Sequence, residues 1–108
     1  MSDSGGNLKL TNDIKDLLIF YVKTNYENYL KQKNIKKIDD SNVEKVTTNI
    51  FQTKKDHAKQ FVKNSLKEVY NEACPNEAVI NMILYEIFED EKLIIYKITE
   101  KIKEHQNK

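Results

Sequence analysis

Several residue types are missing or scarce in this 108-residue chain, and each shortage narrows the fold and the class of function. The single cysteine, Cys74, excludes an intramolecular disulfide and fits a reducing compartment. Only two glycines and one proline occur, which argues against a turn-rich all-β fold and favours long helices. The longest apolar runs are far too short to span a membrane, and no secretory leader is evident. We therefore expect an intracellular protein, cytoplasmic or nuclear.

Arginine and tryptophan are absent, so that apart from two histidines every basic residue is lysine. Lysine is a compact point charge, and it lacks the planar fork with which arginine grips phosphates and reads guanine edges. We therefore do not expect a sequence-specific reader of DNA. Lysine, asparagine and isoleucine are abundant together, as in proteins from AT-rich genomes, and this composition alone would explain the missing arginine.

Charge is sorted into blocks, although the formal net charge of the chain is only +1. Residues 31–67 carry ten lysines against four acidic residues, a net of +6, whereas residues 68–91 carry seven acidic residues and no lysine. Such blocks either pair inside the fold or dock against a charged partner. The sequence leaves both alternatives open.

Apolar spacing predicts an all-α fold, a compact bundle of three to four helices at about residues 11–33, 41–72, 76–89 and 91–105. We expect one helical domain at residues 10–106, preceded by a flexible tail at residues 1–9. The second helix is the long one and should form the spine of the bundle. The third is apolar nearly all round, which predicts a place at the centre or in an oligomer interface.

At two helix boundaries the sequence leaves alternatives open. Ser41 and Glu44 have the spacing of a capping box, which predicts a helix start there, while nearby threonines are weak helix formers that allow a kink. At the other end, the acidic residues 89–91 interrupt the apolar pattern. A break there gives a fourth helix, which we favour; the alternatives are a single helix from Pro75 to Glu104 or a short strand.

A row of lysines runs along the predicted second helix at four-residue spacing, with one more beside it: Lys54, Lys55, Lys59, Lys63 and Lys67. Neighbouring like charges at this spacing cost about 0.2–0.5 kcal/mol per pair. One interpretation is a docking strip for an acidic protein or, less favoured, for a nucleic-acid backbone or an anionic membrane. The other is a solvated face that the acidic segment partly neutralises.

Three tyrosines crowd the end of the first predicted helix: Tyr21, Tyr26 and Tyr29. Tyrosine combines an apolar ring with a polar tip, so it suits either the edge of a core or the centre of an interface. The sequence predicts core-edge packing or, alternatively, a groove that receives an amphipathic helix of a partner.

No pattern predicts catalysis, a metal or a cofactor. The acidic residues 86–91 lack the spacers and glycine of a calcium loop, and the chain has no Glu-x-x-His pair for a di-iron site. Nothing in the spacing brings Cys74 to either histidine, and no glycine-rich loop cradles a phosphate. We therefore predict a non-enzymatic interaction module, an adaptor or subunit that binds an acidic protein partner or a second copy of itself. The alternative is binding to an anionic nucleic-acid backbone or membrane surface.

Overall fold

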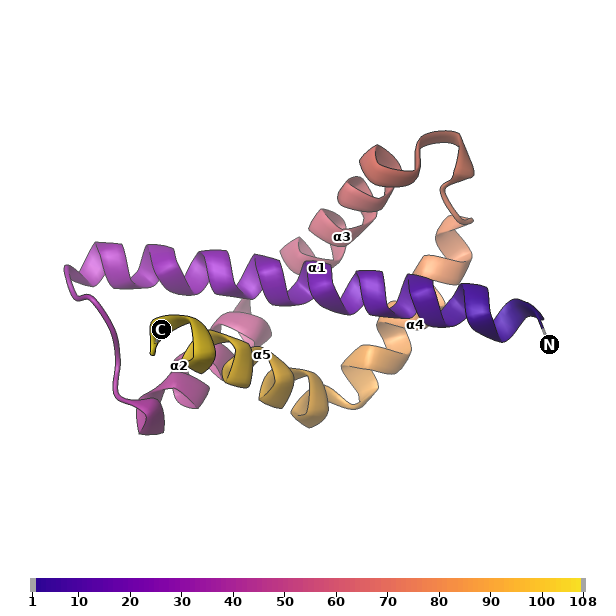
Figure 1. Cartoon of the computed structure of the whole chain (residues 1–108). Coiled ribbons are helices and arrows are strands. Elements are labelled where there is room, and N and C mark those ends of the chain that lie inside the picture. Colours follow the sequence, from indigo (N-terminus) through magenta and orange to yellow (C-terminus); the bar gives the residue numbers. More distant parts are fainter. Residues whose placement is uncertain (1, 108) are drawn as a thin grey trace.

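The computed structural model describes the backbone of residues 2–107 and the side chains of residues 8–107, and in this part the chain is helical throughout apart from short connections (Figure 1). Five α-helices and one short 3-10 helix occur in it: α1 (Ser2–Lys33), α2 (Asp40–Thr53), α3 (Lys55–Tyr70), η1 (Asn71–Ala73), α4 (Glu77–Glu89) and α5 (Glu91–Gln106). The all-α prediction is confirmed, but the predicted number of three to four helices is too low.

The spine of the molecule is α1, not the second predicted helix. Its buried side chains recur at every fourth residue: Leu10, Ile14, Leu18, Val22, Tyr26 and Leu30. This spacing makes a continuous ridge along one side of a helix, against which other helices pack. Helices α2, α3 and α5 all contact α1, and Figure 1 shows it running the length of the molecule.

Helix α1 begins at Ser2, well before the predicted start at residue 11. The flexible tail predicted at residues 1–9 falls largely on residues 1–7, whose side chains lie outside the described part of the chain. At its other end α1 stops at Asn34, which has a φ of 58°. The amides of Asn34 and Ile35 bond back to the carbonyls of Lys31 and Leu30, the pattern of a left-handed helix cap that asparagine tolerates.

The helix predicted at residues 41–72 is not continuous: the chain bends at Lys54, next to one of the threonines that allowed a kink, and forms α2 and α3. The side-chain hydroxyl of Thr53 donates a hydrogen bond to the backbone carbonyl of Asn49 at 2.7 Å. Hydrogen bonds of this kind, from a threonine to the carbonyl four residues earlier, often bend helices. The bend allows the two helices to pack on different partners: α2 packs mainly on α5, while α3 packs on α1.

The predicted capping box is also wrong. Helix α2 begins one residue before Ser41, with Asp39 as its cap residue, and no side chain caps it. Because Ser41 lies inside the first turn, its hydroxyl is not in the place from which it would accept the bond of a capping box.

Helices α4 and α5 are separate, which confirms the fourth predicted helix. Asn76 caps α4 by accepting from the Ala78 amide at 2.8 Å, and the backbone carbonyl of Asp90 receives the first bonds of α5. The expectation that the helix at residues 76–89 lies at the centre is wrong. It packs on α3 and α5 but leaves Met82 58% and Tyr85 65% exposed.

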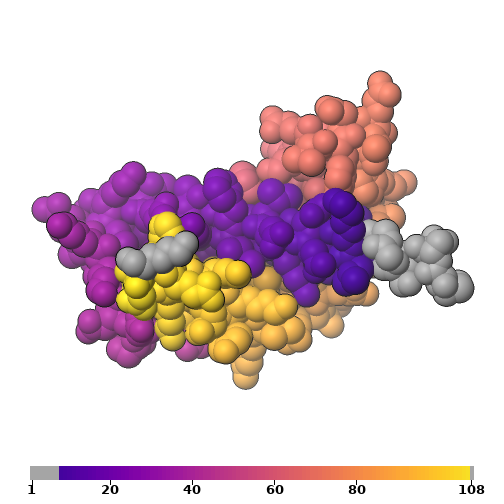
Figure 2. All heavy atoms as spheres, viewed as in Figure 1, coloured from indigo at the N-terminus to yellow at the C-terminus, as the bar shows by residue number. Residues whose placement is uncertain are grey.

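The chain around η1 projects from the body of the molecule, as Figure 2 shows. All five α-helices contribute to one core, with Phe51 of α2, Leu84 of α4 and Ile98 of α5 among its fully buried side chains. Two of the buried residues are polar: the hydroxyls of Thr47 in α2 and Thr99 in α5 find no hydrogen-bond partner within the described residues.

Candidate functional site

The lysine row lies on α3, and the structure shows its members against the acidic end of the same chain. Lys55 forms an ion pair with Glu91 at 3.1 Å, and Lys63 forms one with Glu77 at 3.3 Å. Between them the ammonium group of Lys59 lies 5.0 Å from the centre of the Phe88 ring, a cation–π contact. Three lysines of the row therefore have partners within the chain.

These contacts show that the basic and acidic blocks meet in one molecule. Hydrogen bonds from Gln52 and Lys55, more than the lysine charge itself, hold the pKa of the Glu91 carboxyl below its usual range. Only Lys54 and Lys67 of the predicted docking strip are exposed without a partner among the described residues. Fewer lysine charges of the strip are therefore free to contact another molecule than the sequence indicates.

The tyrosines at the end of α1 lie in different surroundings. Tyr26 is only 2% exposed, and its hydroxyl donates to Gln106 of α5 at 2.8 Å. The amide of Gln106 in turn donates to the carbonyl of Ile38 at 2.8 Å, so this bond network ties the connection after α1 to the end of α5. Burial raises the pKa of the Tyr26 hydroxyl.

Tyr21 and Tyr29 are half-buried at the edge of the core. The ring of Tyr21 packs at 5.2 Å on Phe61 of α3, and Lys33 lies over the ring of Tyr29. These packed rings act as core-edge contacts in this structure, and Tyr26 offers almost no surface to a partner.

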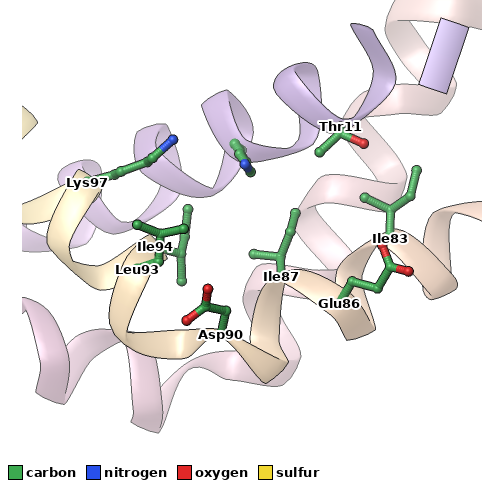
Figure 3. Close-up of a pocket in the computed structure, with 9 residues that line it drawn as sticks. Thr11, Ile83, Glu86, Ile87, Asp90, Leu93, Ile94 and Lys97 are labelled. Carbon is green, nitrogen blue, oxygen red and sulfur yellow. The ribbon is translucent and has the colours of Figure 1, made fainter. Parts of the chain in front are cut away.

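A hollow with an apolar floor lies elsewhere, where α4 and α5 diverge from α1. This hollow, hereafter the groove, has a volume of about 190 Å³ and is lined by Thr11, Lys15, Ile83, Glu86, Ile87, Asp90, Leu93, Ile94 and Lys97 (Figure 3). The main helix contacts of α4 are with α3 and α5, and the groove opens where α4 and α5 diverge beside α1. The bend between α4 and α5 thus leaves one side of each helix without a neighbour.

The floor of the groove is apolar. Ile83, Ile87 and Ile94 are almost completely buried beneath it, and Leu93 at its edge is 47% exposed. On α1, Leu8 lies one turn before Thr11 and is 62% exposed. A concave apolar floor with an exposed leucine at its edge is typical of a surface that a partner covers.

Charge is divided between the two walls of the groove. Glu86 of α4 and Asp90 of the α4–α5 bend are on one side, and Figure 3 shows Lys97 of α5 across from Glu86; Lys15 comes from α1. None of these four side chains forms an ion pair among the described residues. Their charges therefore remain free to meet another molecule.

A second hollow adjoins the groove and shares Lys15 and Lys97 with it. It runs between α1 and α5 past the exposed ring of Tyr96 to the half-buried Ile19. The two hollows give α1 and α5 a continuous uneven surface longer than the groove itself.

The residues considered for chemistry stay apart. His105 lies 3.4 Å from Glu27 at the end of the α1–α5 contact, while Cys74 is half-buried after η1. Within residues 8–107 no group of three or more His, Cys, Asp or Glu side chains is placed to hold a metal ion. Among the described helices, none has the length and apolar content that a membrane crossing requires.

The groove was not predicted from the sequence. Its lining joins residues 11–15 of α1 to residues 83–97 of α4 and α5, which are distant in the sequence, and its shape depends on the bend at Asp90. The local signal is the acidic cluster at residues 86–91, which belongs to the acidic block but does not by itself indicate a groove. Comparison with known proteins adds no relative: no family model, no curated protein and no solved structure matches this chain.

Proposed function

We propose that this chain is a protein-interaction module that receives part of a partner protein in the groove between α1, α4 and α5. The observation that carries the proposal is a hollow with an apolar floor, bordered by four charged side chains that form no ion pair among the described residues. Apolar centres with polar rims are the anatomy of protein interfaces.

The size of the groove favours a protein partner over a small ligand. Pockets for drug-sized molecules measure about 300–1,000 Å³, and the groove offers about 190 Å³. A volume of this size suits one large apolar side chain, and a few such anchors carry most of the energy of an interface.

The lysine row is the less favoured surface for docking. Lys55 and Lys63 are already paired, and an acidic partner would have to compete with Glu91 and Glu77. The same competition weakens the alternative, binding to an anionic nucleic-acid backbone or membrane surface. Of the row, Lys54 and Lys67 remain exposed without an ion-pair partner among the described residues.

A pair of tryptophan substitutions tests the proposal. Thr11→Trp places an indole at the wall of the groove, whereas Thr24→Trp adds the same ring on an exposed face of α1 that does not line it. Tagged wild type and both variants are incubated with nuclease-treated extract of the source cells, and captured proteins are quantified by mass spectrometry.

We expect a protein that is retained by the wild type and by Thr24→Trp but reduced at least tenfold by Thr11→Trp. Circular dichroism spectra must show that all three proteins keep the same helix content. Equal capture by both variants would show that binding does not use the groove, and the proposal would then be abandoned.

A further inference from the structure

The two walls of the groove carry opposite charge, and this restricts what can lie in it. A helix seated on the apolar floor presents one flank to α4 and the other to α1 and α5. The α4 side carries Glu86 and Asp90, and the facing side carries Lys15 and Lys97. A partner helix that is basic on both flanks, or acidic on both, meets like charge on one wall.

We infer that the occupant of the groove is an amphipathic helix with one basic and one acidic flank, separated by an apolar stripe. Its basic flank lies along α4 and its acidic flank along α1 and α5, and one apolar side chain of the stripe enters the groove above Ile83 and Ile87. This inference rests on the proposed function and adds the chemistry of the partner.

Both walls are available for this pairing because the chain leaves their charges unused. The carboxylate of Asp90 caps nothing, although Asp90 is the residue at the start of α5. Glu86 shares α4 with Glu77, but only Glu77 is paired with a lysine. Helix α4 contains no lysine, so no neighbour on its own helix neutralises Glu86.

The arrangement also fixes the direction of the docked helix. Turning such a helix end for end on its apolar stripe exchanges the two flanks, so that each flank would then face like charge. Electrostatic complementarity of this kind selects orientation and suppresses wrong partners more than it adds affinity. The charges of the groove therefore act as a device for orienting the partner.

The expected partner differs in charge from the one predicted from the sequence. The lysine row predicted an acidic partner, but Lys55 and Lys63 of that row are paired within the chain. The charges left without partners at the groove have both signs, and a partner with both signs complements them.

Three synthetic peptides of equal length test the inference with the full chain. All share one apolar stripe; the first has lysine on one flank and glutamate on the other, the second lysine on both, and the third glutamate on both. A fourth peptide has the composition of the first with its stripe broken. Binding is measured by fluorescence anisotropy at low ionic strength, where surface charges are least screened.

We expect the wild type to bind the two-signed peptide about tenfold more tightly than any of the others. The variant Glu86→Lys with Asp90→Lys makes both walls basic and should prefer the peptide with glutamate on both flanks. The variant Lys15→Glu with Lys97→Glu makes both walls acidic and should prefer the peptide with lysine on both flanks.

Several outcomes overturn the inference. They are equal binding of all three striped peptides, an unchanged order of affinity in the two charge-reversed variants, binding of the broken-stripe peptide, or binding that survives Thr11→Trp. If no peptide binds while the cellular partner is still lost with Thr11→Trp, the inference about the helix fails but the proposed function stands.

Discussion

The ion pair between Lys63 and Glu77 allows a quantitative test of how the two charge blocks meet. The atoms are 3.3 Å apart, and the side chain of Lys63 is 19% exposed while that of Glu77 is 61% exposed. At this separation the attraction is about 1.3 kcal/mol in water. Ordering of two long side chains reduces the net value, and we expect about 0.5–1 kcal/mol, the upper part of the range for exposed pairs.

A single substitution does not reveal this value. Replacing Lys63 by glutamine removes the pair, but it also relieves repulsion from Lys59 and Lys67, one turn away on either side. Each such repulsion is about 0.2–0.5 kcal/mol, so the two effects nearly cancel. A double-mutant cycle with Lys63→Gln and Glu77→Gln isolates the ion pair. The effect of Lys63→Gln is measured with Glu77 present and with Glu77 replaced, and the repulsions within the row cancel because they are the same in both measurements.

The assay is urea unfolding followed by circular dichroism, and the quantity is the coupling free energy of the cycle. The matched control is the cycle of Lys67→Gln with Glu77→Gln, since Lys67 belongs to the same row but forms no ion pair among the described residues. We expect coupling near zero there, and the Lys63 coupling should fall below half in 1 M salt. Equal coupling in both cycles would refute the account of the lysine row.

Two further predictions follow from buried and titrating groups. Thr47→Val removes a buried hydroxyl that has no partner among the described residues, so the free energy of unfolding should rise by about 1 kcal/mol. Thermal unfolding measures the change, and a lower midpoint temperature for the variant would contradict the prediction. Hydrogen bonds from Tyr70, and from Gln52 with Lys55, lower the folded-state pKa values of Asp13 and Glu91. The stabilisation from these two carboxylates is therefore present above their unfolded-state pKa values and is lost as the pH falls through their lower folded-state pKa values. The double variant Asp13→Asn with Glu91→Gln should lose less stability than the wild type over the same fall in pH, as measured by urea unfolding.

The helical class and most of the core were predictable because the apolar spacing is regular. The buried residues of α1 recur at every fourth position from Leu10 to Leu30, and this pattern identifies a packed face without knowledge of its neighbours. The break before α5 was predictable for the same reason, because acidic residues at 89–91 interrupt an apolar face.

The bend at Lys54 and the groove were not predictable in the same way. The threonines allow a kink in the helix predicted at residues 41–72, but a single helix also satisfies the local pattern, and the packing of α2 on α5 and of α3 on α1 is not visible in the sequence. The groove depends on how α4 and α5 diverge at Asp90 and on where α1 lies beside them. Such relations join residues as distant as Thr11 and Leu93, and no local spacing records them.

The most direct test of the docking surface is the position of cross-links to the cellular partner. A photo-reactive phenylalanine analogue is placed singly at Leu93 beside the groove, at Lys67 on the lysine row, or at Tyr29 on the tyrosine edge. We predict a partner adduct from Leu93 that Thr11→Trp removes, and none from the other two positions. Adducts from Lys67 or Tyr29 without one from Leu93 would contradict the proposal that the partner docks in the groove.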